Sequence, residues 1–192
     1  MNKVKKFQKD VAELFEERTQ QEAVTEWGSE MGKEMYAPRV DVAVGPFAIA
    51  PGVHRDQEHS HLLHQHLDLF RRLTAFHLEN LNVLTPEATA DEREHHINQK
   101  MDKLFSTNQN ARCFVAIEIE NKVSRKHLMG GAVNGSVLGK VGIAVGFNEE
   151  KHRCFLRLYR YFEFLGQVEK PTFNTANLLI ISKDQLMEAL GG

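Results

Sequence analysis

Apolar side chains recur at two different spacings along the chain, and the change of spacing separates helical from extended segments. A helical spacing of three and four residues runs through roughly residues 3–26, carried by Val4, Phe7, Val11, Leu14 and Phe15. Strict alternation follows, with Val40, Val42 and Val44 on one face and Asp41 between them. The first segment therefore predicts an amphipathic helix and the second a strand whose valines face the core.

The middle of the chain returns to helical spacing. Leucines and phenylalanines between residues 57 and 80 form one stripe, and Thr89 with Glu92 matches a capping box at the start of another helix. We expect two helices, at about 57–80 and 87–106, that pair antiparallel. This pair forms an insertion over residues 54–110, between two strands.

From residue 111 onward, strand and helix patterns alternate. Strands are predicted near 113–122, 141–147 and 177–182, with helices near 126–138 and 149–165 and a short helix at the end. Alternation of this kind is typical of an α/β fold with a central mixed sheet. We therefore expect one domain over residues 1–192, with its core in 1–50 and 111–192.

Composition narrows the class of protein. The chain has 192 residues, 42% of them hydrophobic and 26% charged, with a formal net charge of −2. It contains no apolar run long enough for a membrane span and no signal-peptide pattern. Cys113 and Cys154 lack metal-type spacing, so reduced thiols in a cytoplasmic protein are expected. The small net charge does not prevent a local basic face from contacting phosphates.

The run Ile117-Glu118-Ile119-Glu120-Asn121-Lys122 carries the candidate chemistry. Alternation places Glu118, Glu120 and Lys122 on one face of the predicted strand. Adjacent carboxylates repel each other and require a cation nearby, which Lys122 or a divalent metal can supply. Asp41, a carboxylate within another apolar strand, has the same requirement.

A metal held by Asp41 and Glu120 would lower the pKa of its bound water and neutralise charge on a phosphoryl oxygen. Lys122 is then placed to orient that water and to stabilise the transition state. Glu118 is a supporting or substitute acid. This combination of groups is suited to phosphodiester hydrolysis.

At these residues the sequence resembles the PD-(D/E)XK nuclease superfamily. Asp41 matches the family's strand aspartate, and Glu120-Asn121-Lys122 matches its acidic-x-Lys triplet. Val40 stands where the family usually has a proline, and the separation between the two motifs is long because of the inserted helices. The family core has the order helix, three strands, helix and strand, and the predicted order follows it, with residues 23–27 as a weak candidate for the first of the three strands.

The resemblance implies a restriction-endonuclease-like, three-layer core with a central mixed sheet flanked by helices, plus the inserted helical pair. It further implies a nuclease that uses Mg²⁺ or Mn²⁺, acts on nucleic acid, DNA above all, and can form a homodimer. The backbone carbonyl of Asn121 becomes a further metal ligand. An acid from the first helix is also implied; Glu17 is the candidate retained, with Glu13 and Glu22 as alternatives.

Two groups of basic residues are candidates for phosphate contacts. Arg125 and Lys126 lie at the start of the helix that follows the triplet. Arg153, Arg157 and Arg160 recur on one stripe of the next helix, opposite its apolar side. The three arginines are also explained as a solvated helix face.

Two other functions remain open at this point. The first is a non-catalytic binding or assembly protein on the same fold, with the inserted helices as its partner surface. The second is a transition-metal sensor built on the histidines of the insertion, His59, His61, His64 and His66, with His95 or His96 added.

Overall fold

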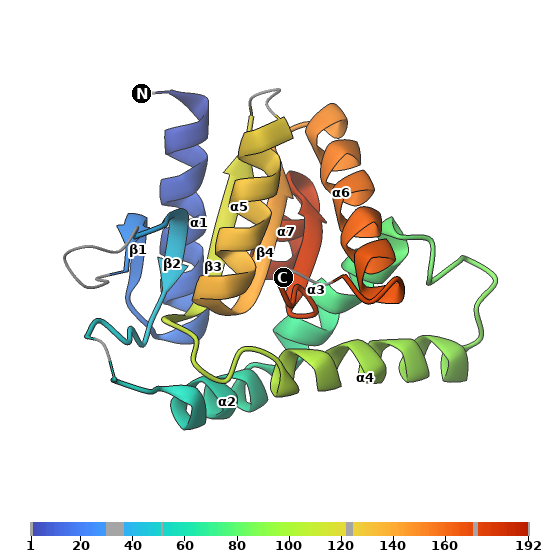
Figure 1. The fold of residues 1–192 in the computed structure, drawn as a ribbon, viewed down its shortest axis with the longest axis horizontal. Helices are drawn as coiled ribbons and strands as arrows, with labels where there is room; N and C mark the ends of the chain where they lie inside the picture. Colours follow the sequence, from blue (N-terminus) through green and yellow to red (C-terminus); the bar gives the residue numbers. More distant parts are fainter. Residues whose placement is uncertain (1, 30–36, 51, 122–124, 171–172, 192) are drawn as a thin grey trace.

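The computed structural model describes residues 2–29, 37–50, 52–121, 125–170 and 173–191. Within these ranges, twelve helices and strands follow one another (Figure 1). The first half contains α1 (Lys3–Thr19), β1 (Ala23–Gly28), β2 (Arg39–Val44), α2 (Asp56–Gln65), α3 (Leu67–Asn80) and α4 (Ala90–Ser106). The second half contains β3 (Cys113–Glu120), α5 (Arg125–Leu138), β4 (Gly139–Gly146), α6 (Glu149–Gln167), β5 (Leu178–Ser182) and α7 (Lys183–Gly191).

The five strands form one sheet in the order β1-β2-β3-β4-β5. β2 runs antiparallel to both β1 and β3, whereas β3, β4 and β5 are parallel. Parallel neighbours need a crossover connection, and α5 and α6 supply the two crossovers. The α/β class and the central mixed sheet expected from the sequence are therefore confirmed.

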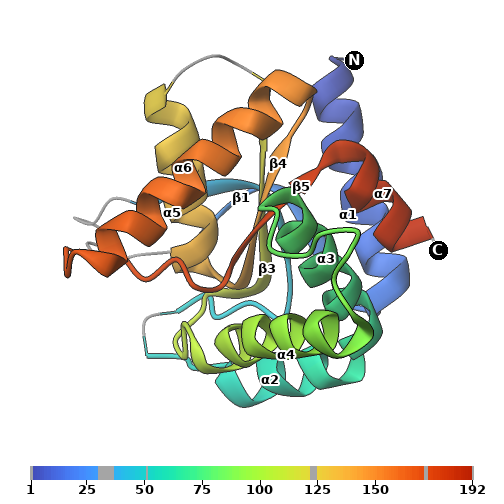
Figure 2. The same ribbon diagram turned by 90° about the vertical axis from the view of Figure 1, so that its right-hand side faces the viewer.

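Helices cover both faces of the sheet, which gives three layers (Figure 2). α1, α3 and α7 pack on the face to which Val42, Ile117 and Ile143 contribute, where the largest buried cluster lies. α5 and α6 pack on the other face, around Ala144, Phe155 and other small and apolar residues. α2 and α4 lie across one end of the sheet. Among the described residues, no helix combines the length and apolarity needed to cross a bilayer.

The inserted segment differs from its prediction, because it contains three helices. The expected helix at 57–80 is interrupted at His66, whose φ of −110° and ψ of 35° leave helical geometry. The break lets Leu63 on α2 and Phe70 on α3 both reach the same buried cluster. Because α3 also contacts β5 and α7, the segment belongs to the core and is not simply attached to it.

The first helix is also shorter than predicted. α1 ends at Thr19, where Gln20 adopts a left-handed conformation (φ 56°) and its N–H donates to the carbonyl of Glu16. The chain then enters β1, so Glu22 lies outside the helix. The weak strand pattern at residues 23–27 is the one that forms, because it pairs with the strongly alternating β2.

α5 approaches the sheet closely because small residues face it. A Cβ at Gly142 on β4 would lie 2.8 Å from the backbone carbon of Gly135 on α5. That distance leaves no room for any side chain. This close packing brings the first turns of α5 against β3, at the position of Glu118.

Candidate functional site

Asp41 lies where β2 and β3 separate. Their backbone register ends at the pair Val42 and Ile117, and Asp41 is the next residue of β2. One carboxylate oxygen accepts the backbone N–H of Ile119 at 2.6 Å, in place of a strand partner. The other accepts the side-chain amide of Gln8 on α1 at 2.7 Å. Two donors, one from the sheet and one from a covering helix, therefore fix this carboxylate.

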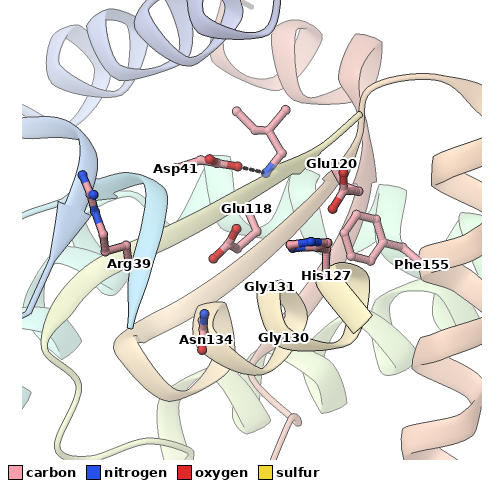
Figure 3. Close-up of a pocket in the computed structure, with 10 residues that line it drawn as sticks. Arg39, Asp41, Glu118, Glu120, His127, Gly130, Gly131, Asn134 and Phe155 are labelled. Carbon is pink, nitrogen blue, oxygen red and sulfur yellow. Dashed lines mark hydrogen bonds between the residues drawn. The ribbon is translucent and has the colours of Figure 1, made fainter. Parts of the chain in front are cut away.

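Glu118 and Glu120 project from β3 on the side covered by α5, as alternation predicts (Figure 3). Glu118 lies directly against the helix, because a Cβ at Gly131 would be 3.2 Å from its Oε2. Within the described part of the chain, no donor lies at hydrogen-bonding distance of the Glu118 carboxylate. Gly131 thus leaves the space in which the half-buried Glu118 carboxylate lies.

The surroundings disfavour negative charge on two of these acids. Burial, and then the charges of Asp41 and Glu120, raise the pKa of Glu118 to about 9. Burial also raises the pKa of Asp41 to about 6, against the lowering effect of the Ile119 hydrogen bond, with the charges of Glu26 and then Glu120 adding to the rise. Both shifts have the causes expected when carboxylates crowd together away from water. A cation would relieve the same crowding.

These acids share one pocket of about 590 Å³. Its lining consists of Arg39, Asp41, Glu118, Ile119, Glu120, His127, Gly130, Gly131, Asn134 and Phe155. The lining comes from β2, β3, α5 and α6, so the pocket opens at the place where the two crossover helices meet the separating strands (Figure 3). The structure therefore brings together Asp41, Glu118 and Glu120, and Asn134 of α5 also lines the pocket.

Other predicted residues of the site fall in or beside a gap in the structure. Asn121 follows β3 directly and is exposed, and it is not part of the pocket lining. Lys122, the candidate catalytic lysine, lies outside the described residues. Arg125 and Lys126 form the first turn of α5, but their side chains are also outside the described part of the structure.

Glu17 does not join the acids of the pocket. It lies exposed near the end of α1, and Gln8 is the α1 residue that contacts Asp41. Nine residues of helix separate the two, which corresponds to about 13 Å along the axis. Glu13 is likewise exposed. The expectation that Glu17 supplies an acid to the site is wrong, because the helix crosses the sheet with its N-terminal half over Asp41.

The three arginines of α6 are all exposed, as their stripe predicted. Arg153 has an exposed partner in Glu149, at 3.7 Å. None of Arg153, Arg157 and Arg160 lines the pocket, although Phe155 of the same helix does. The arginines therefore form a separate basic surface next to the site.

The histidines of the inserted segment do not gather. His59 is fully buried, and its Nε2 lies 2.9 Å from the carbonyl of Pro46. The His64 ring packs on Phe105, with ring centroids 4.3 Å apart. His61 and His66 lie elsewhere on α2 and at its end. Across the ranges that the structure describes, no group of three or more His, Cys, Asp or Glu side chains is placed to hold a metal ion.

Sequence reasoning missed Gln8, Arg39 and His127. Arg39 was predictable, because it precedes Asp41 by two residues on the same strand and so shares its face. Gln8 has no local signal, since its role depends on how α1 crosses the sheet. His127 becomes a pocket residue because α5 begins immediately beside β3.

The donor chemistry of the pocket suits a hard divalent cation. Asp41, Glu118 and Glu120 line one pocket, and carboxylate oxygens are the ligands that Mg²⁺ and Mn²⁺ prefer. In the described part of the chain these three side chains are not arranged as a preformed metal site, so a cation would have to draw them together. A bound cation would favour the ionised forms of Asp41 and Glu118, whose pKa values the pocket raises. Comparison of the chain with protein-family models, with curated proteins and with solved structures finds no match.

Proposed function

We propose that this protein is a metal-dependent phosphodiesterase that cleaves nucleic acid, DNA above all, on a restriction-endonuclease-like core. The observation that carries the proposal is the gathering of Asp41, Glu118 and Glu120 in one open pocket, where burial and the neighbouring charges raise the pKa of Glu118 to about 9. Structural carboxylates are normally paired when buried, whereas active sites keep such groups for function. The order α1, β1, β2, β3, α5, β4 supports the proposal, because it matches the core order of the PD-(D/E)XK family once the inserted α2, α3 and α4 are set aside.

Asp41 and Glu120 are the residues that would hold Mg²⁺ or Mn²⁺, with the backbone carbonyl of Asn121 as a further ligand. When bound, the cation supplies an activated water and neutralises charge on a phosphoryl oxygen. The hydrogen bonds from Gln8 and Ile119 keep Asp41 in one orientation, so the donor is positioned before substrate arrives. Glu118 supports the charge balance from the α5 side.

Cationic groups around the pocket are suited to the phosphate. Arg39 lines the pocket beside Asp41, and one of its amino groups donates to the carbonyl of Glu26 at 3.1 Å. Its remaining N–H groups can donate to a phosphate oxygen. Lys122 keeps the role of orienting the attacking water, and Arg125 and Lys126 contact the neighbouring phosphates. The exposed arginines of α6 extend this basic surface away from the pocket.

Titration calorimetry with Mg²⁺ and with Mn²⁺ tests the metal site directly. Binding is expected for the wild type and for Glu17→Gln, a matched control that removes an exposed carboxylate of α1. Binding is expected to be lost in Glu120→Gln and in Asp41→Asn, because each removes one charged oxygen donor. Circular dichroism confirms that each variant is folded. Metal binding that is unchanged in both site variants would overturn the proposal.

A further inference from the structure

The outer face of α6 carries more than its arginines. Seen from Arg157, helical spacing places Arg153, Arg160, Tyr161, Phe164 and Val168 on the same side of the helix. We call these six residues the α6 outer face. The opposite side of α6, which includes Phe155 and Tyr159, packs on the sheet with α5. The outer face is therefore not needed for the core.

Large apolar side chains stand exposed on this face. Tyr161 is 46% exposed, Phe164 is 53% exposed and Val168 is 42% exposed. Along the same side of α6, Glu150, which pairs with Lys151 at 3.0 Å, comes first, the three arginines follow, and the aromatic rings lie beyond them. From Arg153 to Phe164 the face extends about 16 Å along the helix. Exposed apolar groups next to concentrated positive charge indicate a binding surface more than a solvated one.

Charge decides what this surface accepts. Among the described residues, no carboxylate forms an ion pair with Arg157 or Arg160, so two guanidinium groups are free for an anionic partner. A second copy of the same chain, docked symmetrically on this face, would bring arginines against arginines. A polyanion that also presents flat apolar groups complements both halves of the face, the arginine half and the aromatic half.

We infer that the α6 outer face binds single-stranded nucleic acid, with the arginines on its phosphates and Tyr161 and Phe164 stacked on unpaired bases. Bases in a duplex are already stacked on each other, so only an unpaired strand offers its faces to these rings. The inference rests on the proposed function, since it names the form of the substrate: a strand with an unpaired segment beside the scissile bond. Phe155, on the opposite side of the same helix, lines the pocket, so α6 lies between the pocket and its outer face.

Fluorescence anisotropy tests this inference with a labelled mixed-sequence oligodeoxynucleotide and with its duplex, both in EDTA so that no cleavage occurs. We expect the wild type to bind the single strand more tightly than the duplex. The variant Tyr161→Ala/Phe164→Ala should bind the single strand at least about five-fold more weakly. Tyr161→Phe should retain wild-type affinity, because stacking does not need the hydroxyl. Ile49→Ala, which removes another exposed apolar side chain, is the matched control.

Salt dependence separates the two halves of the face. Each phosphate contact contributes about 0.7 to the slope of log affinity against log salt for a single strand. Arg157→Ala/Arg160→Ala should therefore reduce the magnitude of that slope by about 1.4. The aromatic variant should leave the slope unchanged. Lys5→Ala, which removes one exposed charge from α1, should alter neither slope nor affinity.

Three results would overturn the inference: wild-type affinity of the aromatic variant for the single strand, no preference over the duplex, or binding to phosphatidylserine vesicles without binding to the oligonucleotide. These outcomes are distinct from failure of the proposed function. If the oligonucleotide binds as expected but no metal-dependent cleavage occurs, the α6 outer face is still a binding surface and the proposed nuclease activity is rejected. Metal-dependent cleavage by the wild type, together with unchanged single-strand binding by Tyr161→Ala/Phe164→Ala, would support the nuclease and reject the α6 outer face as a binding surface.

Discussion

At the scale of single residues, the Asp41 carboxyl group is held in one position by hydrogen bonds, in surroundings that disfavour its ionised form. Gln8 and Ile119 hold the carboxylate, while burial and the charges of Glu26 and Glu120 raise its pKa to about 6. Because this folded-state pKa exceeds the ordinary value of 3.8, the carboxyl group favours folding at low pH, and that contribution is lost as the pH rises through about 6. At neutral pH the ionised carboxylate therefore costs stability.

Asp41→Asn should consequently increase the free energy of unfolding, by about 1 to 2 kcal/mol at pH 7 in EDTA. The amide keeps an oxygen acceptor for the Ile119 N–H and removes the charge. Urea denaturation measures the effect, with Glu17→Gln expected within about 0.5 kcal/mol of wild type. A less stable Asp41→Asn protein would mean that the hydrogen bonds to the charged form outweigh its burial.

Lys100 is a buried base away from the pocket, and it makes a separate prediction. Its Nζ donates to the Tyr159 hydroxyl at 3.0 Å and to the carbonyls of Ala176 and Leu178 at 2.8 and 2.9 Å. Burial, and then the charge of Lys103, lower its pKa to about 7, against a smaller raising effect of Glu163. The group thus connects α4 to α6 and to the start of β5.

Between pH 7 and about 10, the unfolded chain should hold a proton on Lys100 that the folded chain has released. The free energy of unfolding of the wild type should therefore rise with pH relative to Lys100→Met. Urea denaturation of both proteins at several pH values checks this difference. Because both proteins contain the other titrating groups, such as Glu118, the contributions of those groups cancel in the comparison. His77 packs on Tyr159 and is held neutral by burial, so it does not titrate in this range. Parallel curves for the two proteins would contradict the prediction.

At the scale of elements, the packing of α5 on β3 decides whether Glu118 fits. Gly131→Ala would place a methyl group 3.2 Å from the Glu118 carboxylate, whereas a Cβ at the neighbouring Gly130 meets nothing within 4 Å. Gly130→Ala should stabilise the protein by about 0.5 to 1 kcal/mol through helix propensity. Gly131→Ala should lose that gain and weaken Mg²⁺ binding, because it displaces Glu118.

Urea denaturation and metal titration on the two alanine variants separate these effects. Equal stabilisation and equal metal affinity in both would show that Glu118 moves freely and that α5 does not position it. The pair is closely matched, since the two glycines are neighbours on one helix and the substitution is the same.

The elements were predictable where one periodicity dominates and unpredictable where tertiary contacts decide. Alternation correctly placed β2 and β3, and with them the shared face of Glu118 and Glu120. The break at His66 carries no glycine or proline, and it forms because helices on either side must both reach the core. The end of α1 at Thr19 is set by the pairing of β1 with β2, which local sequence does not reveal.

At the scale of the whole molecule, the pocket collects residues that are far apart in sequence, from Arg39 to Phe155. The sequence identified Asp41, Glu118 and Glu120 because strand patterns and charge mark them individually. It did not identify Gln8, and it wrongly favoured Glu17, because the path of a helix across a sheet depends on packing along its whole length. Lys122 is central to the proposed chemistry and lies outside the described residues, so its role is tested by substitution.

Cleavage of mixed single- and double-stranded DNA in Mg²⁺ or Mn²⁺ is the measurement that tests the central claim most directly. The wild type and Glu17→Gln should cleave, EDTA should stop the reaction, and Glu120→Gln and Lys122→Ala should each slow it at least about 100-fold while remaining folded. Loss of that size matches the removal of a group that acts in the transition state. No cleavage by the wild type with either metal, or cleavage that persists in both site variants, would contradict a nuclease site at this pocket.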